Sequence, residues 1–373
     1  MIVLINNPIL QTYFFSAILF LALVLSIRKR KDQEFFPISV SQELKGFAIL
    51  TIIFAHVAYA LVSDSSFLNP LSTMAGVGVN LFLILSGYGL IISSLKKPSS
   101  VWQFYKYRLL KIYIPFWIFL VIFFSLDFFV LHLNYGWAYI AQSFLGFFSR
   151  ANLYLDVNSP FWYFSWIVMY YLIFPCLLIK KAPWLSAILI YILTFLIIKL
   201  EPSFLNQVIH LYRVHLIAFP LGILLGWFFN SSSTWFKIKD YFIRNSVAIY
   251  GYKKISLQVI SSLFLITVIL YLNKHSGVGD KPIIEESISI LTSLIFIALF
   301  LIKRIEIKTL YLFGIFSYEI YMLHWPLMYR YDFLFKFMPA WLALAFYLVI
   351  FLGLGWLTKY VIEKIGEFLA KKA

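Results

Sequence analysis

The stretch LKGFAILTIIFAHVAYALV, residues 44–62, is an almost unbroken apolar run. Its length is close to the roughly 20 residues that a helix needs to cross a bilayer. The apolar residues are continuous and do not alternate with polar ones. Because backbone polar groups cannot stay unpaired in hydrocarbon, the run predicts a transmembrane helix and not a strand of a barrel.

The rest of the chain repeats this pattern. Hydrophobic residues make up 62% of the 373 residues and charged residues 13%, against roughly 45–50% and 25% in soluble domains. A soluble fold is therefore excluded, and the sequence predicts an all-α integral membrane protein, a polytopic bundle of about eleven transmembrane helices. The other ten runs are residues 8–27, 75–95, 112–131, 161–179, 184–200, 211–229, 255–272, 286–302, 309–328 and 340–362. Residues 138–148 are expected to be a re-entrant or interfacial piece.

The distribution of Lys and Arg predicts the orientation. With the loop after the first run in the cytoplasm, most of the 31 basic residues lie on the cytoplasmic side. The exceptions are Arg150, Lys199, Arg213, Lys274, Lys281, Arg330 and Lys336. The positive-inside rule then places the amino terminus outside and the carboxyl terminus in the cytoplasm of a multi-pass protein of the cell (inner or cytoplasmic) membrane.

The net charge of +15 comes mostly from the basic residues that set this orientation, and no basic soluble module is present to bind nucleic acid. The first run lacks leading positive charge, so we interpret it as a retained helix and not as a signal peptide.

Ionisable residues inside the runs are candidates for function, because charge at the bilayer centre costs at least roughly 2.5–3.5 kcal/mol. Lys45 and His56 lie eleven residues apart, which places them on one helix face with about 16 Å between them. Lys45 is then at the cytoplasmic boundary, and His56 is near the midplane. The simpler alternatives are a snorkelling anchor for Lys45 and a helix-packing residue for His56.

Five segments, taken in order, resemble the acyltransferase 3 family of integral membrane acyltransferases. They are ELKGFAILTIIFAHV (Glu43–Val57), GVGVNLFLILSGYGL (Gly76–Leu90), RLLKIYIPFWIF (Arg108–Phe119), FWYFSWIVMYYLIFP (Phe161–Pro175) and FSYEIYMLHWPL (Phe316–Leu327). Each segment alone is weakly specific, but the series is characteristic of the family. The resemblance implies a ten-helix core, so residues 43–373 form the membrane-embedded acyltransferase domain, and residues 1–42 add a transmembrane helix and a basic cytoplasmic loop.

The resemblance also implies an activity. It is the transfer of an acyl group, usually acetyl, from cytoplasmic acyl-CoA across the membrane to a hydroxyl of a cell-envelope glycan or lipid-linked saccharide. The chain would then be an acyl-CoA-dependent membrane-bound O-acyltransferase. Its partners are acyl-CoA, the saccharide and membrane lipid, with acetyl-CoA as a donor substrate and with no permanently bound cofactor or metal.

Residue roles follow from the matched segments. His56 is the expected catalytic residue, either as a general base or as a covalent acyl carrier with ping-pong kinetics. Lys45, Arg108 and Lys111 are expected to bind the phosphates of CoA. Lys45 and Lys111 stand where the family usually has Arg, which replaces a bidentate fork by a point charge.

Two further groups of residues are expected to shape the site. Asn80, Ser86 and Gly87 of the third run would orient the histidine or make room for the CoA arm, with close helix packing as the alternative for the small residues. Asn80 replaces an acidic residue of the family, so it can orient the histidine but not charge it. Acceptor-side candidates are Trp162, Tyr163, Ser317, Tyr321 and His324. For His324 a structural role is the alternative, and for Trp162 and Tyr163 an aromatic belt.

A competing function is that of a carrier or flippase for a lipid-linked saccharide without acyl transfer. Carriers of this kind often contain paired broken helices in two corresponding halves, and no such internal symmetry is visible in the sequence. A sensory or scaffold protein would give no reason for the His56 and Arg108 segments to occur together. The identity of the acceptor is not encoded in a recognisable motif.

Overall fold

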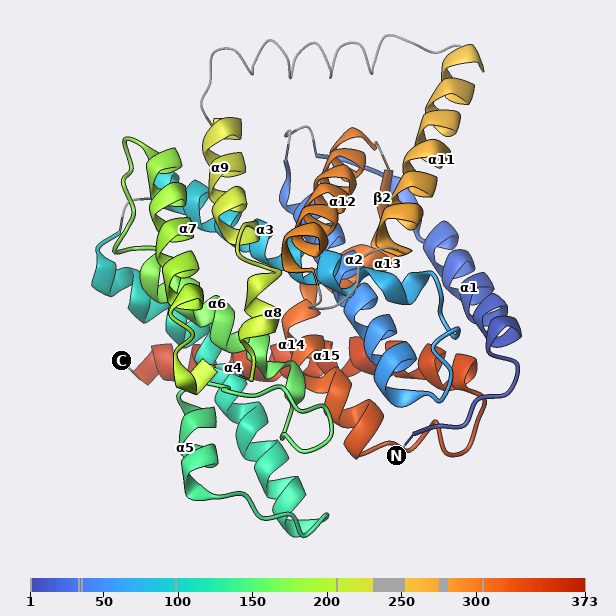
Figure 1. Cartoon of the computed structure of the whole chain (residues 1–373), viewed down its shortest axis with the longest axis horizontal. Helices are drawn as coiled ribbons and strands as arrows, with labels where there is room; N and C mark the ends of the chain where they lie inside the picture. The colour runs from blue at the N-terminus through green and yellow to red at the C-terminus, as the bar shows by residue number, and fades with distance from the viewer. Residues whose placement is uncertain are drawn as a thin grey trace.

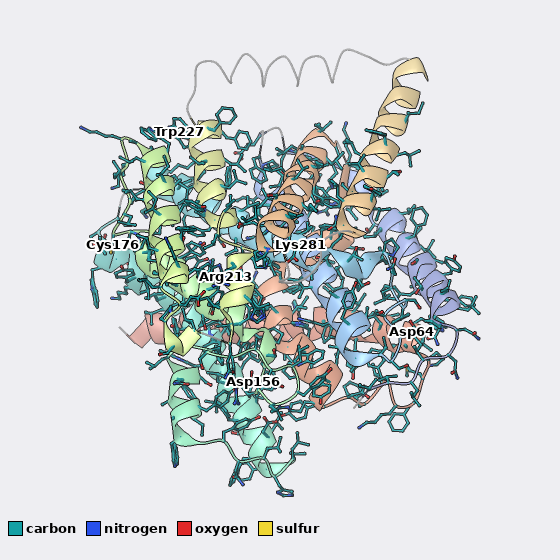
Figure 2. The ribbon with its side chains drawn as sticks, in the orientation of Figure 1. Asp64, Asp156, Cys176, Arg213, Trp227 and Lys281 are labelled. Atoms are coloured by element: carbon teal, nitrogen blue, oxygen red, sulfur yellow. The ribbon has the colours of Figure 1, made fainter. Side chains whose placement is uncertain are left out.

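The computed structural model describes residues 2–32, 34, 36–97, 99–205, 207–230, 252–274, 281–303 and 305–372, and most of them are helical (Figure 1). Among these residues, seven helical stretches, some of which join two elements, are long and apolar enough to cross a membrane: Pro8–Leu25, Ile38–Leu61, Leu71–Lys96, Val101–Phe129, Ile209–Asn230, Pro282–Ile302 and Ala340–Lys364. Many large apolar side chains are exposed along the outside of the bundle (Figure 2). The chain is thus a multi-pass, all-α membrane protein, and the number of eleven spans stays a prediction.

The elements follow one another along the chain with few long loops between them. In the first half they are α1 (Pro8–Leu25), β1 (Ile27–Lys29), α2 (Ile38–His56), a π-helical turn (Val57–Leu61), a 3-10 turn (Leu71–Met74), α3 (Ala75–Lys96), α4 (Val101–Phe129), α5 (Trp137–Phe144), a 3-10 turn (Ser159–Phe161) and α6 (Trp162–Ile173). In the second half they are α7 (Pro183–Lys199), a 3-10 turn (Ser203–Leu205), α8 (Ile209–Arg213), α9 (Ala218–Asn230), α11 (Tyr252–Lys274), α12 (Pro282–Ile302), β2 (Ile305–Ile307), α13 (Lys308–Ile315), α14 (Ser317–Trp325), a second π-helical turn (Pro326–Arg330) and α15 (Ala340–Lys372).

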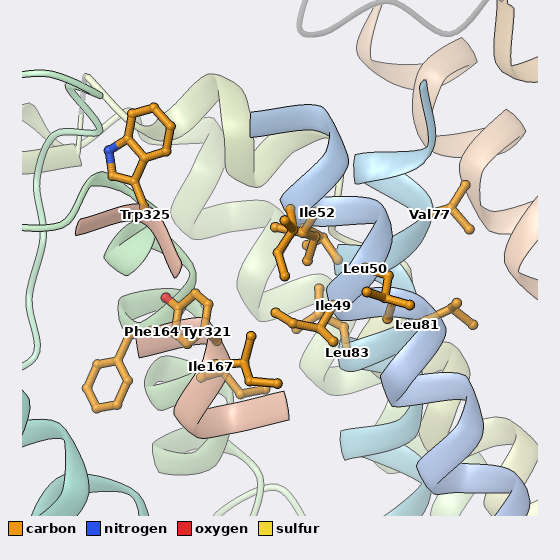
Figure 3. Close-up of a cluster of buried hydrophobic side chains, with 14 of the residues drawn as sticks. Ile49, Leu50, Ile52, Val77, Leu81, Leu83, Phe164, Ile167, Tyr321 and Trp325 are labelled. Carbon is orange, nitrogen blue, oxygen red and sulfur yellow. The ribbon is translucent and has the colours of Figure 1, made fainter. Parts of the chain in front are cut away.

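Helix α2 is the centre of the bundle, with α3 packed on one side and α13 on another. Figure 3 shows Ile49 and Ile52 of α2 beside Leu81 and Leu83 of α3. Glycines allow the backbones to approach closely, as is usual where helices pack in membranes. A Cβ atom on Gly314 of α13 would lie 1.8 Å from a carbonyl oxygen of α2. The close packing of α13 against α2 therefore depends on the absence of a side chain at Gly314.

We expect Gly314→Ala to reduce the stability of the protein strongly, because the new methyl group meets backbone and not a flexible side chain. Overpacking of this kind costs about 1–3 kcal/mol and sometimes more. Thermal unfolding in detergent measures the effect. Gly353→Ala on α15 is the matched control, since nothing lies within 4 Å of its added Cβ. Equal melting temperatures for the two variants would contradict the packing argument.

The short strands tie the amino-terminal segment to the end of α12. They pair antiparallel, with Arg28 opposite Glu306, and the two side chains form an ion pair. Lys303 forms an ion pair with the fully buried Glu43 at the start of α2. Helix α1 packs on α15 and α13, so it lies outside the helices that surround α2.

Three predicted spans are shortened or divided in the structure, and the run 112–131 lies almost entirely within the longer helix α4, which begins at Val101. Residues 161–179 contain only a 12-residue helix, α6, which ends two residues before Pro175, as expected before a residue that cannot continue a helix. Residues 211–229 are divided into α8 and α9, and residues 309–328 into α13 and α14. Such breaks are tolerated in a membrane where the free backbone groups are buried in protein. The break before α9 shows this, because the Ile217 N–H donates to the Glu286 carboxylate at 2.6 Å.

Candidate active site

His56 and His324 form a hydrogen-bonded pair at the centre of the bundle. His56 Nδ1 lies 3.0 Å from His324 Nε2. The ring planes are inclined by 12° with centroids 5.1 Å apart. His324 is fully buried, whereas the His56 ring is partly exposed. The pair joins α2 to α14 across 268 residues of sequence.

The surroundings of His324 fix the protonation of both rings. His324 Nδ1 lies 2.9 Å from the Tyr321 carbonyl oxygen and 3.1 Å from that of Ile320. Carbonyl oxygens only accept hydrogen bonds, so Nδ1 carries the proton, and Nε2 of the neutral ring accepts. His56 Nδ1 must then donate to it. The lone pair of His56 is therefore on Nε2, for which the described residues provide no hydrogen-bond partner.

Both histidines stand next to irregular helical turns. The π-helical turn Val57–Leu61 follows His56 directly, and the second one, Pro326–Arg330, begins two residues after His324. Single π-helical turns inside helices occur often at functional sites. Here the two turns widen both helices at the same level of the bundle.

The neighbours of the pair are held by hydrogen bonds to the segment that precedes α6. Trp325, whose ring centroid is 5.5 Å from that of His56, donates from Nε1 to the Leu153 carbonyl at 2.8 Å. The Tyr321 hydroxyl donates to the Pro160 carbonyl at 2.6 Å. Asn158 donates to the Met322 carbonyl at 2.8 Å. These bonds fix α14, and with it the orientation of His324.

The three predicted phosphate ligands lie together. The charges of Arg108 and Lys111 on α4 repel the ammonium group of Lys45 on α2, so the three cations share one region. The Arg108 guanidinium lies over the Tyr171 ring, 5.2 Å from its centroid, and its buried Nε has no hydrogen-bond partner in the described part of the chain. Clustered cations of this kind favour an anionic ligand.

One face of α3 is open near Tyr171, the ring on which the Arg108 guanidinium lies. Phe82, Ser86 and Gly89, spaced by four and three residues, share this face, and all three are partly exposed although most of α3 is buried. The Ser86 hydroxyl is 3.4 Å from that of Tyr171. Nothing lies within 4 Å of a Cβ placed on Gly89. The neighbouring helices thus leave this face of α3 incompletely covered.

Two expectations for α3 need correction. A Cβ on Gly87 would lie 2.3 Å from the Phe219 carbonyl oxygen, so Gly87 packs against α9 and leaves no room for a ligand. Asn80 does not orient His56. Its Oδ1 accepts from His215 Nδ1 at 2.7 Å, and its Nδ2 donates to Ser289 at 2.7 Å.

His215 is a buried histidine to which the sequence analysis assigned no role. It lies in the break between α8 and α9, and its ring stacks on Trp162 at 5.8 Å between centroids. The Asn80 contact forms only because that break brings the imidazole to α3. Arg213 and His215 interrupt the apolar run at the break, and Pro220 follows in the first turn of α9, but these local signals do not show that the imidazole reaches α3.

Four of the five acceptor-side candidates form a series of ring contacts, from Trp162 through Tyr163 and Tyr321 to His324. His324 belongs to the histidine pair, and the Ser317 hydroxyl donates to the Gly314 carbonyl of the preceding turn at 2.9 Å. Trp162 stacks on His215, whereas Tyr163 contacts Tyr321 edge to face at 5.7 Å. Their roles toward an acceptor stay predictions.

The depth of His56 along its helix also differs from the expected one. Helix α2 begins at Ile38, six residues before the predicted run, and its π-helical extension ends at Leu61. His56 is therefore about 27 Å from the first residue, at a rise of about 1.5 Å per residue, and lies in the second half of the helix. The predicted orientation places this half toward the outside.

Comparison with known proteins identifies the family to which this arrangement belongs. A family model described as an acyltransferase domain, that of the acyltransferase 3 family, matches residues 44–360. The chain belongs to the acyltransferase 3 family. The matched region of this acyltransferase includes the cation cluster and both members of the histidine pair. No curated protein and no solved structure matches the chain.

Proposed function

We propose that this membrane acyltransferase transfers an acyl group, usually acetyl in its family, from cytoplasmic acyl-CoA to a hydroxyl of a cell-envelope glycan or lipid-linked saccharide. It is then an acyl-CoA-dependent membrane-bound O-acyltransferase of the cell membrane. The observation that carries the proposal is the histidine pair, because its hydrogen bonds leave a basic lone pair on a partly exposed ring.

The chemistry follows from that lone pair. The acceptor hydroxyl attacks the thioester carbonyl, and its proton passes to His56 Nε2. A C–O bond forms, the C–S bond breaks, and the CoA thiolate leaves and takes the proton from the imidazolium. While His56 is charged, its Nδ1–H donates a stronger, charge-assisted hydrogen bond to His324 Nε2. His324 is therefore a positioning residue, which sets the tautomer of His56 without contacting substrate.

The cation cluster supports the choice of donor. Lys45, Arg108 and Lys111 supply positive charge from two helices, as the anionic phosphates of CoA require. A cavity of about 220 Å³, lined in part by Phe104, opens one turn before Arg108 on α4. The uncovered face of α3 lies beside the cations, because the Ser86 hydroxyl is next to that of Tyr171, on whose ring Arg108 lies. This face offers space for the part of the CoA arm that follows the phosphates.

A carrier without acyl transfer uses none of this geometry. A saccharide that only crosses the membrane needs neither a fixed imidazole tautomer nor a cation cluster on the side opposite its exit. The histidine pair therefore favours the enzyme over the carrier.

The test is to incubate membranes that contain the protein with radiolabelled acetyl-CoA and to extract the envelope glycans. We expect label in the glycan fraction only when the protein is present, and mass spectrometry should show an added acetyl mass. A carrier leaves the glycans unlabelled with or without the protein, and that result would refute acyl transfer.

A further inference from the structure

A second cavity opens at the end of the bundle beyond the histidine pair. It has a volume of about 280 Å³, and its lining includes Leu61, Tyr154, Met328, Tyr329, Arg330 and Lys336. We call it the Tyr154 pocket. Its volume is near the lower end of the roughly 300–1,000 Å³ of small-molecule sites, which suits a single sugar ring.

The Tyr154 pocket lies one helical turn from the proposed base. Leu61 is five residues after His56 on the same helix, and Met328 is four residues after His324. The aromatic rings form a continuous series between the two sites. Tyr329 stacks on Trp325 at 5.1 Å, and Trp325 in turn contacts His56 at 5.5 Å. A ligand in this pocket is therefore beside the end of the site that the acceptor must approach in the predicted orientation.

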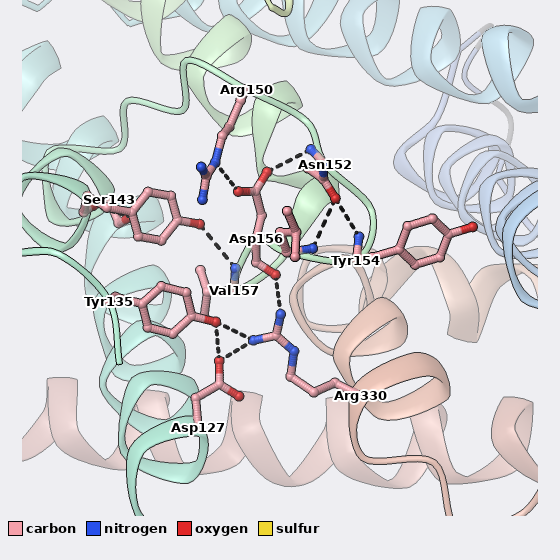
Figure 4. A network of polar contacts seen from close by, with 11 residues as sticks. Asp127, Tyr135, Ser143, Arg150, Asn152, Tyr154, Asp156, Val157 and Arg330 are labelled. Carbon is pink, nitrogen blue, oxygen red and sulfur yellow. Dashed lines mark hydrogen bonds and ion pairs between the residues drawn. The ribbon is translucent and has the colours of Figure 1, made fainter. Parts of the chain in front are cut away.

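The walls of the pocket are held rigidly by a buried polar network (Figure 4). Arg330 forms an ion pair with the fully buried Asp127 and donates to the Asp156 carbonyl at 2.6 Å. The Asp156 carboxylate in turn accepts from Arg150 at 2.5 Å. Burial raises the pKa of the Tyr135 phenol, so it stays protonated and donates to Asp127 at 2.6 Å. The segment that contains Tyr154 is thereby fixed in place.

Tyr154 itself has the features of a stacking platform. Its hydroxyl donates to the Ala60 carbonyl at 3.2 Å, which fixes the ring, and the residue is still 44% exposed. Aromatic rings that are fixed and open in this way offer a flat apolar surface. The C–H face of a sugar ring is complementary to such a surface.

The polar groups of the pocket indicate a ligand without net charge. The charge of Arg330 is compensated by Asp127, and the pocket adds one further cation, Lys336, and one further carboxylate, Asp332. The described residues provide no hydrogen-bond partner for the Tyr329 hydroxyl or the Lys336 ammonium. Sugar hydroxyls both donate and accept, so they match a lining of this mixed kind.

We propose that the Tyr154 pocket binds a neutral sugar residue of the acceptor saccharide, with its ring stacked on Tyr154. This inference rests on the proposed function in one respect: the saccharide is called an acceptor because the protein is proposed to acylate it. The saccharide site itself rests on the cavity, the fixed aromatic ring and the balanced charges.

Binding and transfer are measured separately so that the two proposals can fail separately. The probe is a mixture of oligosaccharides released by mild acid from the envelope of the producing cell and labelled with tritium. Equilibrium dialysis with the purified full chain in detergent measures binding. The second arm measures acetyl transfer from acetyl-CoA to the same oligosaccharides.

We expect Tyr154→Ala to weaken oligosaccharide binding, and to raise the apparent KM for the acceptor, by about tenfold, with the KM for acetyl-CoA unchanged. Tyr154→Phe retains the ring and should stay close to the parent protein. Trp137→Ala on α5 is the matched control, because Trp137 is 85% exposed and outside the pocket.

The outcomes separate the proposals. Equal binding by the parent protein and Tyr154→Ala, or no binding by either, would overturn the saccharide site. Transfer with an unchanged acceptor KM in Tyr154→Ala would overturn it as well and leave the proposed function intact. Binding that depends on Tyr154, without any transfer by the parent protein, would support the pocket and refute acyl transfer.

Discussion

His56→Ala should lower the rate of glycan acetylation by about 10²–10⁴-fold, the usual contribution of a positioned general base. The reason is that Nε2 of this ring carries the lone pair that the hydrogen bonds around His324 leave free. The measurement is transfer of label from acetyl-CoA to envelope glycan at equal amounts of folded protein. His210→Ala is the control, since His210 is an exposed histidine on α8. A rate within a few-fold of the parent protein would exclude His56 as the base.

The partner histidine separates a chemical role from a structural one. His324→Leu removes the acceptor for His56 Nδ1 and frees the tautomer, so we expect a loss of about 10–100-fold, the range known for the partners that orient metal-binding histidines. His324→Gln can still accept from Nδ1 and should recover part of the rate with its pH profile displaced. Equal losses in both variants would mean that His324 only packs.

The same assay without glycan distinguishes the two chemical roles of His56. A covalent acyl carrier retains label on the protein after incubation with acetyl-CoA alone, whereas a general base does not. The geometry serves both, because a lone pair that accepts a proton also attacks a carbonyl. If His56 is a covalent carrier, His56→Ala should abolish the label retained on the protein. If His56 is a general base, neither the parent protein nor His56→Ala should retain label.

The sequence was sufficient for features that depend on local composition. The all-α membrane class follows from continuous apolar runs, and α1, α2 and α3 begin and end within a few residues of the predicted limits, apart from the early start of α2. The family was recognisable from five segments, and the family model confirms it.

Features that depend on contacts distant in sequence were not predictable. In residues 309–328 the local signals for the break at Phe316 are Gly314 and Ser317, which are weak on their own. The helix that ends there, α13, packs against α2, a contact distant in sequence. Likewise the sequence predicts Asn80 as a partner for His56, whereas the fold brings His215 to it. His324 was identified as a candidate, but its contact with His56 required the position of α14 beside α2.

The last prediction concerns the buried ion pair that supports the Tyr154 pocket. Arg330→Met should lower the free energy of unfolding by about 3–5 kcal/mol, the cost of leaving one partner of a buried pair without the other. Asp127 is fully buried, and the Arg330 side chain is only 8% exposed. Denaturation in detergent measures the change. The matched control is Arg213→Met, which removes the exposed pair with Glu201 and should cost about 0–1 kcal/mol.

The double variant Asp127→Leu/Arg330→Met decides whether the cost comes from the uncompensated charge or from lost packing. With both charges gone neither ion of this pair is left buried without its partner, so stability should recover in large part. The Asp156 carbonyl still loses its donor, however, and the segment that carries Tyr154 loses one of its attachments. A stable double variant with weakened saccharide binding would therefore show that the ion pair shapes the pocket more than it stabilises the fold. A double variant as unstable as Arg330→Met would show that these side chains contribute packing and not charge.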